Sequence, residues 1–295
     1  MFKIYASIPH KQVGSLPEYT MLKFSGGEIH VRITSWKTEH NTVTITANLT
    51  DSDKVLELVM LVDAFRRIEP NVKLNLVCPY LPYARQDRVC AEGEALGVRP
   101  IADIINSLNF DSVELWDVHS DVSLALVNRV HNIGPETFLG NVLGRNRYRE
   151  VNGTAEQYIL VSPDAGAMKK VGKVAKKFNL PMITASKIRD PKNGEITGTQ
   201  IHIPAEHYTK TFLIVDDICD GGRTFTELAK AITFEVTAFS NRVGVTEPRI
   251  ELYVTHGIFS KGLAVITEAG IKHIYTANPF PNVDTTNPNL TIVRV

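Results

Sequence analysis

The chain has 295 residues, with 32 Lys plus Arg, 32 Asp plus Glu, 43% hydrophobic and 8% aromatic residues. This composition is typical of globular domains and argues against disorder, collagen or a coiled coil. The length predicts about two domains. Because the net charge is zero, nothing draws the whole chain to nucleic acid or to an acidic membrane. A phosphate site would therefore have to be a local arrangement of charges.

Targeting signals and cysteines are also informative. No apolar run approaches the ~18 residues of a membrane span, and the first residues lack the basic and apolar regions of a secretory signal. The cysteines Cys78, Cys90 and Cys219 have no CxxC spacing, and their odd number argues against a disulfide framework. We therefore expect reduced thiols in a cytoplasmic protein, with neither nucleic acid nor membrane as a partner.

In the first half, apolar strand-like runs alternate with helical patterns. The expected elements are strands at residues 43–49, 72–78 and 112–116 and helices at 52–68 and 98–108. Asp51 or Ser52 can cap the first helix. That helix is apolar on most faces, which predicts that it is buried between layers.

The second half repeats this plan. The expected elements are strands at residues 158–161, 181–185 and 212–215 and helices at 167–178 and 224–232. Alternation of strands and helices predicts an α/β fold with mainly parallel sheets flanked by helices. A weak internal echo, residues 76–80 (LVCPY) against 160–164 (LVSPD), favours two related halves, although chance similarity of short apolar runs is the alternative.

The sharpest segment is residues 212–225 (FLIVDDICDGGRTF), where an apolar strand ends in two acids before a glycine turn and a helix. Backbone N–H groups at such a helix start favour anions, so the turn at Gly221 and Gly222 can hold a phosphate. Asp216 and Asp217 repel phosphate but suit sugar hydroxyls or a metal. The combination predicts a sugar-phosphate site more strongly than a capped surface turn.

This segment resembles the phosphate loop of type I phosphoribosyltransferase-fold proteins. Other segments narrow the resemblance to the family of ribose-phosphate diphosphokinases, which synthesise phosphoribosyl pyrophosphate (PRPP). They follow in family order along nearly the whole chain: residues 24–28 (FSGGE), 79–88 (PYLPYARQDR), 117–119 (DVH), 161–166 (VSPDAG), Lys187 with Arg189, and 255–260 (THGIFS). Any one match can be accidental, but the ordered set is highly specific.

The resemblance implies a reaction in which the β,γ-diphosphoryl group of Mg-ATP passes to the C1 hydroxyl of ribose 5-phosphate, giving PRPP and AMP. It implies two tandem phosphoribosyltransferase-like domains: residues 1–142 with the ATP-contacting motifs, and 143–295 with the ribose 5-phosphate loop and a catalytic loop. It also implies Mg²⁺ as the cofactor. A homo-oligomer follows, at least a dimer and commonly a hexamer, because residues 24–28 would reach a neighbouring subunit's site.

Several first-half residues can serve this chemistry, which depends on positioning and charge stabilisation. The resemblance assigns ATP to Phe24, Glu28, Arg85, Gln86, Asp87, Arg88 and His119. A solvated charged loop is the alternative for the four residues from Arg85. Asp117 and His119 follow a strand with one residue between them, so alternation predicts that both side chains face Mg²⁺ or the triphosphate together. A lone histidine of this kind is more often structural.

In the second half, Lys187 and Arg189 lie in a polar segment, residues 186–200, that we expect to be a mobile loop between two strands. Closing over ATP, they would neutralise charge and exclude water, and the resemblance makes them catalytic together with His119. Asp164 can face the ribose and Mg²⁺ or simply cap the helix after it. The full assignments are ribose 5-phosphate to Asp164, Asp216, Asp217, Asp220, Gly221, Gly222, Arg223 and Thr224, and the metal to Asp117, His119 and Asp164.

Three positions in two segments, residues 24–28 and the phosphate loop, depart from the family pattern. Gly26 replaces the usual Asp or Asn of the adenine segment, which removes a side-chain acceptor. The phosphate loop usually reads Asp-Thr-Gly-Gly-Thr, so a threonine hydroxyl is lost at Gly221 and an arginine is added at Arg223. Two other functions stay open: a phosphoribosyltransferase that consumes PRPP, and a non-catalytic regulatory subunit associated with a PRPP synthetase. Such subunits usually lose the basic residues that this chain keeps at Lys187 and Arg189.

Overall fold

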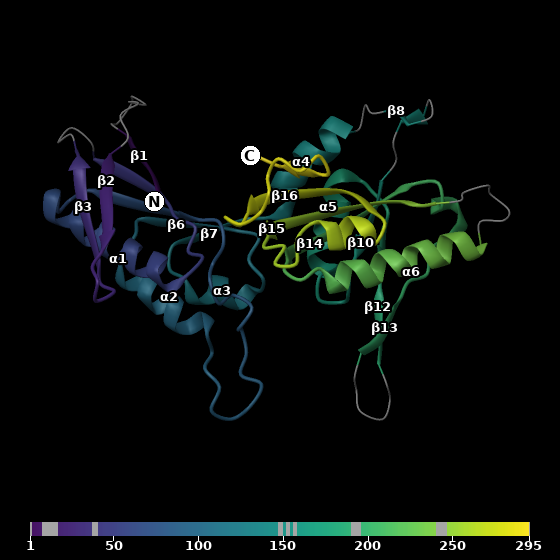
Figure 1. Ribbon diagram of the computed structural model, residues 1–295, viewed down its shortest axis with the longest axis horizontal. Coiled ribbons are helices and arrows are strands. Elements are labelled where there is room, and N and C mark those ends of the chain that lie inside the picture. The colour runs from purple at the N-terminus through teal and green to yellow at the C-terminus, as the bar shows by residue number, and fades with distance from the viewer. Residues whose placement is uncertain are drawn as a thin grey trace. The chain divides into compact units, whose positions relative to one another are not determined.

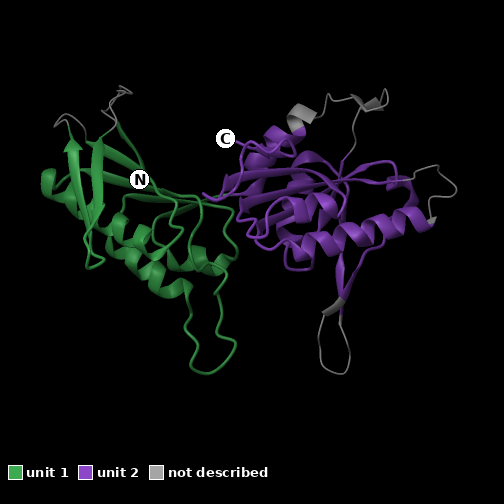
Figure 2. Cartoon of the chain, viewed as in Figure 1, with its two compact units in different colours: residues 1–133 green, residues 134–295 purple. Residues whose placement is uncertain are grey.

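The chain divides into two compact units, Met1–Ile133 and Gly134–Val295 (Figure 2). The computed structural model describes residues 2–7, 17–36, 41–146, 150–151, 154–155, 158–189, 196–239 and 247–294. The expected boundary at 142/143 falls inside helix α4 (Pro135–Asn146). The division lies earlier in the chain because α4 contacts α5 (Met168–Phe178) and β15 (Arg249–Gly257) of the second unit.

The first unit contains a five-stranded sheet with the order β1-β4-β5-β6-β7 (Figure 1). Its strands are β1 Lys3–Ser7, β4 Thr42–Thr46, β5 Lys73–Cys78, β6 Ser112–Trp116 and β7 Val130–Ile133. Strand β1 pairs antiparallel with β4, and the other four strands are parallel and follow chain order. The structure confirms the three strands predicted for this half, with β4 shorter than expected at its end.

Three helices connect these strands: α1 Ser52–Ile68, α2 Val98–Ser107 and α3 Asp121–Leu126. The predicted start of α1 is confirmed, because the Asp51 side chain accepts a hydrogen bond of 2.9 Å from the Lys54 backbone N–H. The expectation that α1 is buried between layers holds only for part of its surface, although strand β3 (Ile29–Ser35) packs on it. Phe65 is fully buried, but Leu56 and Met60 are 50% and 44% exposed. The helix therefore buries one face in the ordinary amphipathic way.

A separate antiparallel hairpin, β2 (Glu18–Lys23) and β3 (Ile29–Ser35), lies between β1 and β4 in the chain, and β3 packs on α1 (Figure 1). The turn between its strands lies where the two glycines predicted it. The N–H of Gly27 donates to the carbonyl of Phe24 at 2.8 Å, and Gly27 has a φ of 94°. This left-handed conformation favours glycine over residues with a Cβ atom.

The second unit is built on a six-stranded sheet with the order β11-β10-β14-β15-β16-β17, in which all neighbours are parallel. The strands not yet given are β10 Tyr158–Ser162, β11 Met182–Thr184, β14 Thr211–Cys219, β16 Ile271–Pro279 and β17 Leu290–Ile292. The chain runs from β10 outward to β11 and then returns to the other side of β10 as β14. This reversal is a topological switch point, where the carboxyl ends of adjacent strands open a crevice for ligands.

Helices cover both faces of this sheet. On one face α6 (Arg223–Phe239) buries Leu228 and Ile232 in the same cluster as Phe212 and Ile214 of β14. On the other face lies α5, because its Lys170 reaches Asp217, which alternates with those strand residues. The short helix α7 (Ala264–Glu268) contacts α6 and β16. Burial on both faces is typical of parallel sheets and accounts for the apolar run of β14.

Two expectations for this unit need correction. Strand β14 does not end before the two acids but continues through them to Cys219, paired with β15. The polar segment 186–200 is an antiparallel ribbon rather than a loop, with arms β12 (Ser186–Arg189) and β13 (Ile196–Gln200). Its tip, residues 190–195, lies outside the described residues. None of the helices described here has the length and apolarity needed to cross a membrane.

Candidate functional site

The carboxyl ends of β10 and β14 bring together the polar residues of the second unit. Asp164 follows the end of β10, while Asp216 and Asp217 lie near the end of β14. The two strands are neighbours in parallel register, so these carboxylates lie at the same edge of the sheet. The turn at Asp220–Gly222 then leads directly into α6. The predicted ribose 5-phosphate residues are therefore grouped at the switch point.

The adjacent carboxylates of Asp216 and Asp217 are unfavourable to ionise together in this environment. Asp217 is buried and Asp216 half-buried, and the backbone N–H of Asp217 donates to Oδ1 of Asp216 at 2.9 Å. Burial, together with the neighbouring Asp217 carboxylate, raises the pKa of Asp216 well above its usual value. Lys170 Nζ lies 3.7 Å from Oδ2 of Asp217 and offsets part of this repulsion. Hydrogen bonds from donors such as sugar hydroxyls, or a bound cation, can reduce the repulsion between these two carboxylates.

The turn before α6 can accept an anion. Gly222 has a φ of 77°, and a Cβ atom there would lie 3.2 Å from Cγ1 of Ile266, so glycine is required on both counts. Among the described residues, none accepts from the N–H groups of Gly221, Arg223 and Thr224. These are the unsatisfied donors of a helix start, where the dipole favours negative charge.

The Arg223 side chain does not complete this turn. Its Nε lies 2.7 Å from Oε1 of Glu227, one helical turn along α6, and the side chain is 80% exposed. The expected arginine contact to phosphate would therefore require this pair to break. Backbone N–H groups are the part of the turn that is already in place.

Asp164 takes the capping role, one of the two that the sequence left open. Its Oδ1 accepts from the N–H groups of Gly166 and Ala167 at 2.9 and 3.2 Å, and its Oδ2 lies 2.9 Å from Nζ of Lys187. Burial raises the pKa of Asp164, but the hydrogen bonds from Lys187 and the backbone outweigh this and leave it below the usual value. A carboxylate predicted to bind ribose and a predicted catalytic lysine are thus adjacent.

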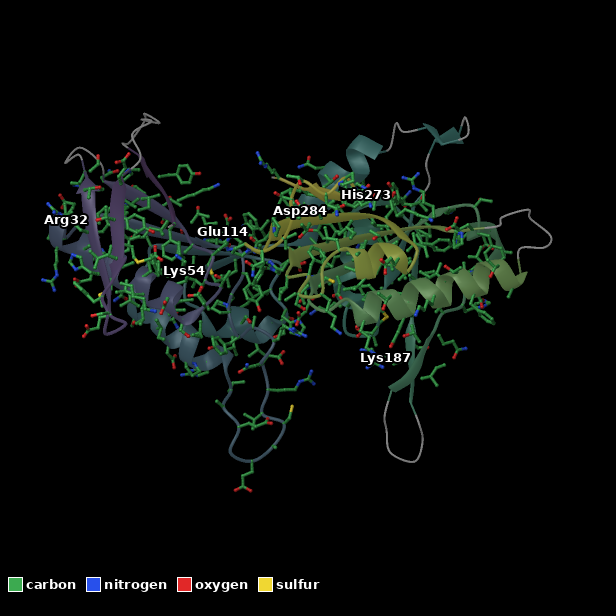
Figure 3. All side chains as sticks on the ribbon, viewed as in Figure 1. Arg32, Lys54, Glu114, Lys187, His273 and Asp284 are labelled. Carbon is green, nitrogen blue, oxygen red and sulfur yellow. The ribbon has the colours of Figure 1, made fainter. Side chains whose placement is uncertain are left out.

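In the antiparallel ribbon of β12 and β13, from here on the β12–β13 hairpin, Lys187 lies on β12 and pairs with Thr199 of β13 (Figure 3). Extended backbone was the condition for Lys187 and Arg189 to act together, and β12 is extended, although a register irregularity lies between Ile188 and Arg189. The Arg189 side chain lies outside the described residues. Of the two predicted catalytic residues on this hairpin, Lys187 is therefore the one whose side chain the structure places.

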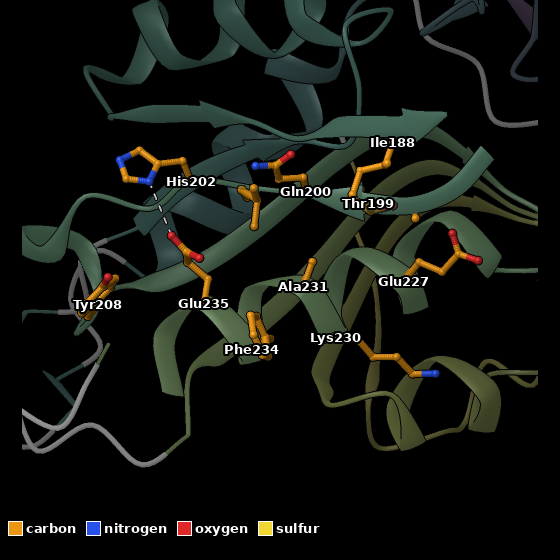
Figure 4. A pocket seen from close by; sticks show the side chains of 12 residues that line it. Ile188, Thr199, Gln200, His202, Tyr208, Glu227, Lys230, Ala231, Phe234 and Glu235 are labelled. Atoms are coloured by element: carbon orange, nitrogen blue, oxygen red, sulfur yellow. Dashed lines mark ion pairs between the residues drawn. The ribbon is translucent and has the colours of Figure 1, made fainter. Parts of the chain in front are cut away.

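A cavity of about 810 Å³ lies between this hairpin and α6 (Figure 4). Ile188 and Gly198 line it from the hairpin, and Phe234 lines it from α6. At its other end Nδ1 of His202 lies 3.5 Å from Oε1 of Glu235. The hairpin therefore does not pack tightly on the helix along this length, which leaves space for it to move.

In the first unit, the prediction that Asp117 and His119 share a face by strand alternation is wrong. Strand β6 ends at Trp116, and Asp117 has a φ of 40°, so the alternation stops one residue earlier than assumed. Asp117 is buried and His119 is exposed. The backbone N–H of Asp117 donates to the carbonyl of Ile133 at 2.8 Å, which holds the bend at the carboxyl edge of the sheet.

The loop after β5 presents its basic residues to solvent. Arg85 and Arg88 are exposed, and Nε of Arg88 lies 3.7 Å from Oδ1 of Asp87. The Gln86 side chain instead lies on Gly97, close enough that a Cβ atom there would clash with it. Gln86 therefore packs against the start of α2, whereas the two arginines remain accessible.

The predicted adenine segment is the tip of the β2–β3 hairpin. Phe24 is 53% exposed, with its ring centroid 6.1 Å from that of His30, and Glu28 is exposed at the end of the same turn. An exposed aromatic ring on a hairpin tip is available for stacking. Within this unit the tip, the loop after β5 and the edge residue Asp117 are three separate segments.

The donors fit Mg²⁺ only in part. Within the described ranges no three His, Cys, Asp or Glu side chains gather closely enough to hold a metal ion. Mg²⁺ is usually bound by one or two carboxylates together with waters and substrate phosphates. Asp117 in the first unit and Asp164 in the second each offer one such carboxylate within their own unit. His119 offers an imidazole nitrogen, which suits other metals better.

Sequence reasoning missed two lysines near the second-unit site, Lys170 and Lys261. The first reaches Asp217 from α5. The second follows β15, and its Cε lies 3.5 Å from the position that a Cβ atom of Gly221 would occupy. Both come close through the parallel sheet rather than along the chain. The signal available in the sequence was that turns after neighbouring parallel strands meet at one edge.

A parallel α/β sheet with a switch point, paired acids and a glycine turn defines a protein of the sugar-phosphate-binding class. Two family models match the chain in succession: the N-terminal domain of ribose phosphate pyrophosphokinase over residues 4–108, and the phosphoribosyl transferase domain over residues 130–234. The ribose-phosphate pyrophosphokinase of Thermococcus kodakarensis is 27% identical over 90% of this chain and 86% of its own.

Further comparisons agree. The ribose-phosphate pyrophosphokinase of Thermosipho africanus is 27% identical over 87% of this chain and 76% of its own. The fold is similar to that of phosphoribosylpyrophosphate synthetase from Mycobacterium smegmatis, with a TM-score of 0.74, 20% identity, and coverage of 95% of this chain and 87% of that one. The chain belongs to the ribose-phosphate pyrophosphokinase family of enzymes.

Proposed function

We propose that this chain transfers the β,γ-diphosphoryl group of Mg-ATP to the C1 hydroxyl of ribose 5-phosphate, giving PRPP and AMP. The observation that carries the proposal is the edge at the end of β14, where two acids, one buried and one half-buried, precede a glycine turn and a helix start. Among the described residues, the N–H groups of Gly221, Arg223 and Thr224 have no acceptor. Acids for hydroxyls and N–H groups for phosphate are what a phosphorylated sugar requires. The match of the first unit to the pyrophosphokinase domain supports ATP as the other substrate.

In this proposal the second unit binds the sugar. The N–H groups of Gly221, Arg223 and Thr224 hold the 5-phosphate, with Gly222 and Asp220 shaping the turn, and Asp216 and Asp217 accept hydrogen bonds from the ribose hydroxyls. Hydroxyl donors relieve the repulsion that raises the pKa of Asp216. The sugar is thereby oriented with its C1 hydroxyl toward the diphosphoryl donor, which supplies the entropic part of the rate enhancement.

The transfer itself exchanges one bond for another. The C1 oxygen forms a bond to the β-phosphorus, the bond from that phosphorus to the oxygen bridging the α-phosphorus breaks, and AMP leaves with this oxygen. The C1 hydroxyl proton passes to solvent. Lys187, assisted by Arg189, stabilises the charge that develops on the moving group. Lys187 must first leave Asp164, which frees that carboxylate for the ribose or the metal.

The first unit binds Mg-ATP in this proposal, with Arg85 and Arg88 on the phosphates and Asp117 near the metal. Phe24 and Glu28 would contact adenine in a neighbouring copy of the chain, which makes the working form at least a dimer. When bound, Mg²⁺ neutralises phosphate charge. We also propose that the enzyme operates in the cytoplasm, where its three cysteines remain free thiols.

The test is product identity. Purified protein is incubated with ATP, Mg²⁺ and ribose 5-phosphate and followed by phosphorus NMR. AMP and PRPP should appear in equal amounts. Formation of ADP would indicate ordinary kinase chemistry, and no turnover across a range of phosphate concentrations would contradict the proposal. If PRPP were instead consumed with a nucleobase, the chain would be a phosphoribosyltransferase.

A further inference from the structure

The turn that follows β15 is tied to the phosphate turn that follows β14. The N–H groups of Ile258 and Phe259 donate to the carbonyl of Cys219 at 2.9 and 3.1 Å, and that of Ser260 donates to the carbonyl of Asp220 at 3.2 Å. Phe259 has a φ of 47°, so the turn takes a tight and defined path. These hydrogen bonds hold the backbone of the following residue, at position 261, close to the start of α6.

The next residue is Lys261. Its Cε and Cδ lie 3.5 and 3.7 Å from the position that a Cβ atom of Gly221 would occupy. Because a C–N bond is about 1.5 Å long, its ammonium nitrogen lies within about 5 Å of that point. Lys261 is exposed, and no ion pair joins it to another described residue. The stem of a cation without a carboxylate partner among the described residues therefore runs past Gly221, the first glycine of the phosphate turn.

The other nearby cation is already engaged. Arg223 is paired with Glu227 along α6 and points away into solvent. At position 221 this chain has glycine where the family pattern has threonine, and a Cβ atom there would be in van der Waals contact with the Lys261 stem. The turn thus lacks a threonine hydroxyl at the position that the lysine stem covers.

We propose that Lys261 binds the phosphate group of the sugar-phosphate substrate and makes the site select phosphorylated over unphosphorylated sugar. The inference rests on the proposed function, since it assigns the ligand of the same turn. An ammonium acts as a point charge on phosphate, and it adds to the backbone N–H groups that hold the same oxygens.

The experiment measures binding separately from turnover. Ribose 5-phosphate and ribose are titrated by calorimetry into the wild type, Lys261→Met and Lys261→Arg. Methionine keeps the length of the stem and removes the charge. Hydrogen bonds to charged groups contribute about 1.5–3 kcal/mol, so Lys261→Met should weaken ribose 5-phosphate binding by about 10- to 100-fold. Its ribose affinity should stay unchanged, and Lys261→Arg should retain most of the affinity for the phosphorylated sugar.

Kinetics and a matched control complete the design. In Lys261→Met the KM for ribose 5-phosphate should rise while kcat changes little, because the phosphate group is remote from the reacting C1 hydroxyl. Lys272→Met, a half-exposed lysine paired with Glu247, should behave as the wild type. If the wild type binds ribose 5-phosphate and Lys261→Met binds it equally well, the inference is overturned and the proposed function stands. A wild type that neither binds ribose 5-phosphate nor forms PRPP would overturn both.

Discussion

The two units use the same kind of sheet and finish its carboxyl edge differently. In the first unit the parallel strands follow chain order from β4 to β7, and the edge carries a single buried acid, Asp117, in left-handed backbone. In the second unit the order reverses at β10, and the edge carries two adjacent acids and a glycine turn before the long helix α6. The first unit has only the six-residue helix α3 in the corresponding place.

This difference shows how one architecture can serve two ligands. A reversal of strand order opens a crevice in the sheet edge itself, so rigid elements hold the groups that contact a small, densely functional ligand. Without a reversal, the ligand-facing groups must come from loops and from the hairpin tip, as we propose for Arg88 and Phe24. We therefore expect substitutions at the second-unit edge to have larger and more residue-specific effects than those in the first unit.

The largest difference in enzyme activity should appear when one basic residue of each unit is replaced by alanine. Lys187→Ala should lower kcat by about 10²- to 10³-fold, the usual cost of removing one charge-stabilising donor, while the fold remains. Arg88→Ala, an exposed arginine of the first unit, should lower kcat/KM by only about 10-fold. Steady-state assays of PRPP formation compare the two. Near-normal turnover of Lys187→Ala would remove the hairpin from the mechanism.

The next largest effect should come from the acid pair Asp216 and Asp217. We propose that these carboxylates bind the ribose, whereas their repulsion lowers the stability of the folded state. The pKa of Asp216 lies above its unfolded value because of burial and Asp217. The folded state therefore binds the proton more tightly, and stability falls as pH rises from the usual aspartate range to the raised pKa. Asp216→Asn should unfold at a higher temperature than the wild type at pH 7 and lose this advantage near pH 4, while PRPP formation drops.

Asp117→Asn is the matched variant in the first unit. Asp117 is also buried, so its replacement also removes a carboxylate from a poorly solvated place. Its neighbours in sequence, Trp116 and Val118, carry no charge, so the variant does not relieve a repulsion between adjacent carboxylates, and its unfolding temperature at pH 7 should rise less than that of Asp216→Asn. Thermal unfolding of both variants across pH 4 to 8 decides the point. Equal rises, or no rise in Asp216→Asn, would show that the two edges do not differ electrostatically as described.

The elements could be predicted from sequence where the pattern was unambiguous. Alternating or continuous apolar runs located β5, β6 and β10, and the Asp51 cap located the start of α1. Strand β15 and the β2–β3 hairpin were not predicted as strands, and the hairpin is mostly polar on its open face. Strand order, including the reversal at β10, depends on long-range pairing that no local pattern encodes.

The candidate site was predictable as motifs and not as contacts. Ordered resemblance named Asp164, Lys187 and the phosphate turn, but the ion pair between Asp164 and Lys187 spans the hairpin and β10. The prediction that Asp117 and His119 share a face by strand alternation is wrong because the backbone of Asp117 is left-handed. Lys261 was missed because its motif ends one residue earlier, and only the bonds from its turn to Asp220 bring it to the site.

The glycines of the second unit give a smaller, structural test. Gly222 and Gly262 both have a φ of 77°, but a Cβ atom at Gly222 would press on Ile266, whereas at Gly262 nothing lies within 4 Å. Gly262→Ala should cost only the left-handed backbone term, about 1–2 kcal/mol. Gly222→Ala should cost about 1–3 kcal/mol more from overpacking and should weaken ribose 5-phosphate binding. Urea unfolding measures both, and equal losses would argue against a tightly packed turn.

The smallest effect should come from Arg223, the residue that distinguishes this phosphate turn in sequence. Because its guanidinium is paired with Glu227 on an exposed helix surface, Arg223→Ala should change stability very little and raise the KM for ribose 5-phosphate less than about twofold. Lys261→Met in the same assay provides the scale. A large rise in KM for Arg223→Ala would mean that the Glu227 pair breaks on binding, and that the phosphate turn is rearranged by its ligand rather than prepared for it.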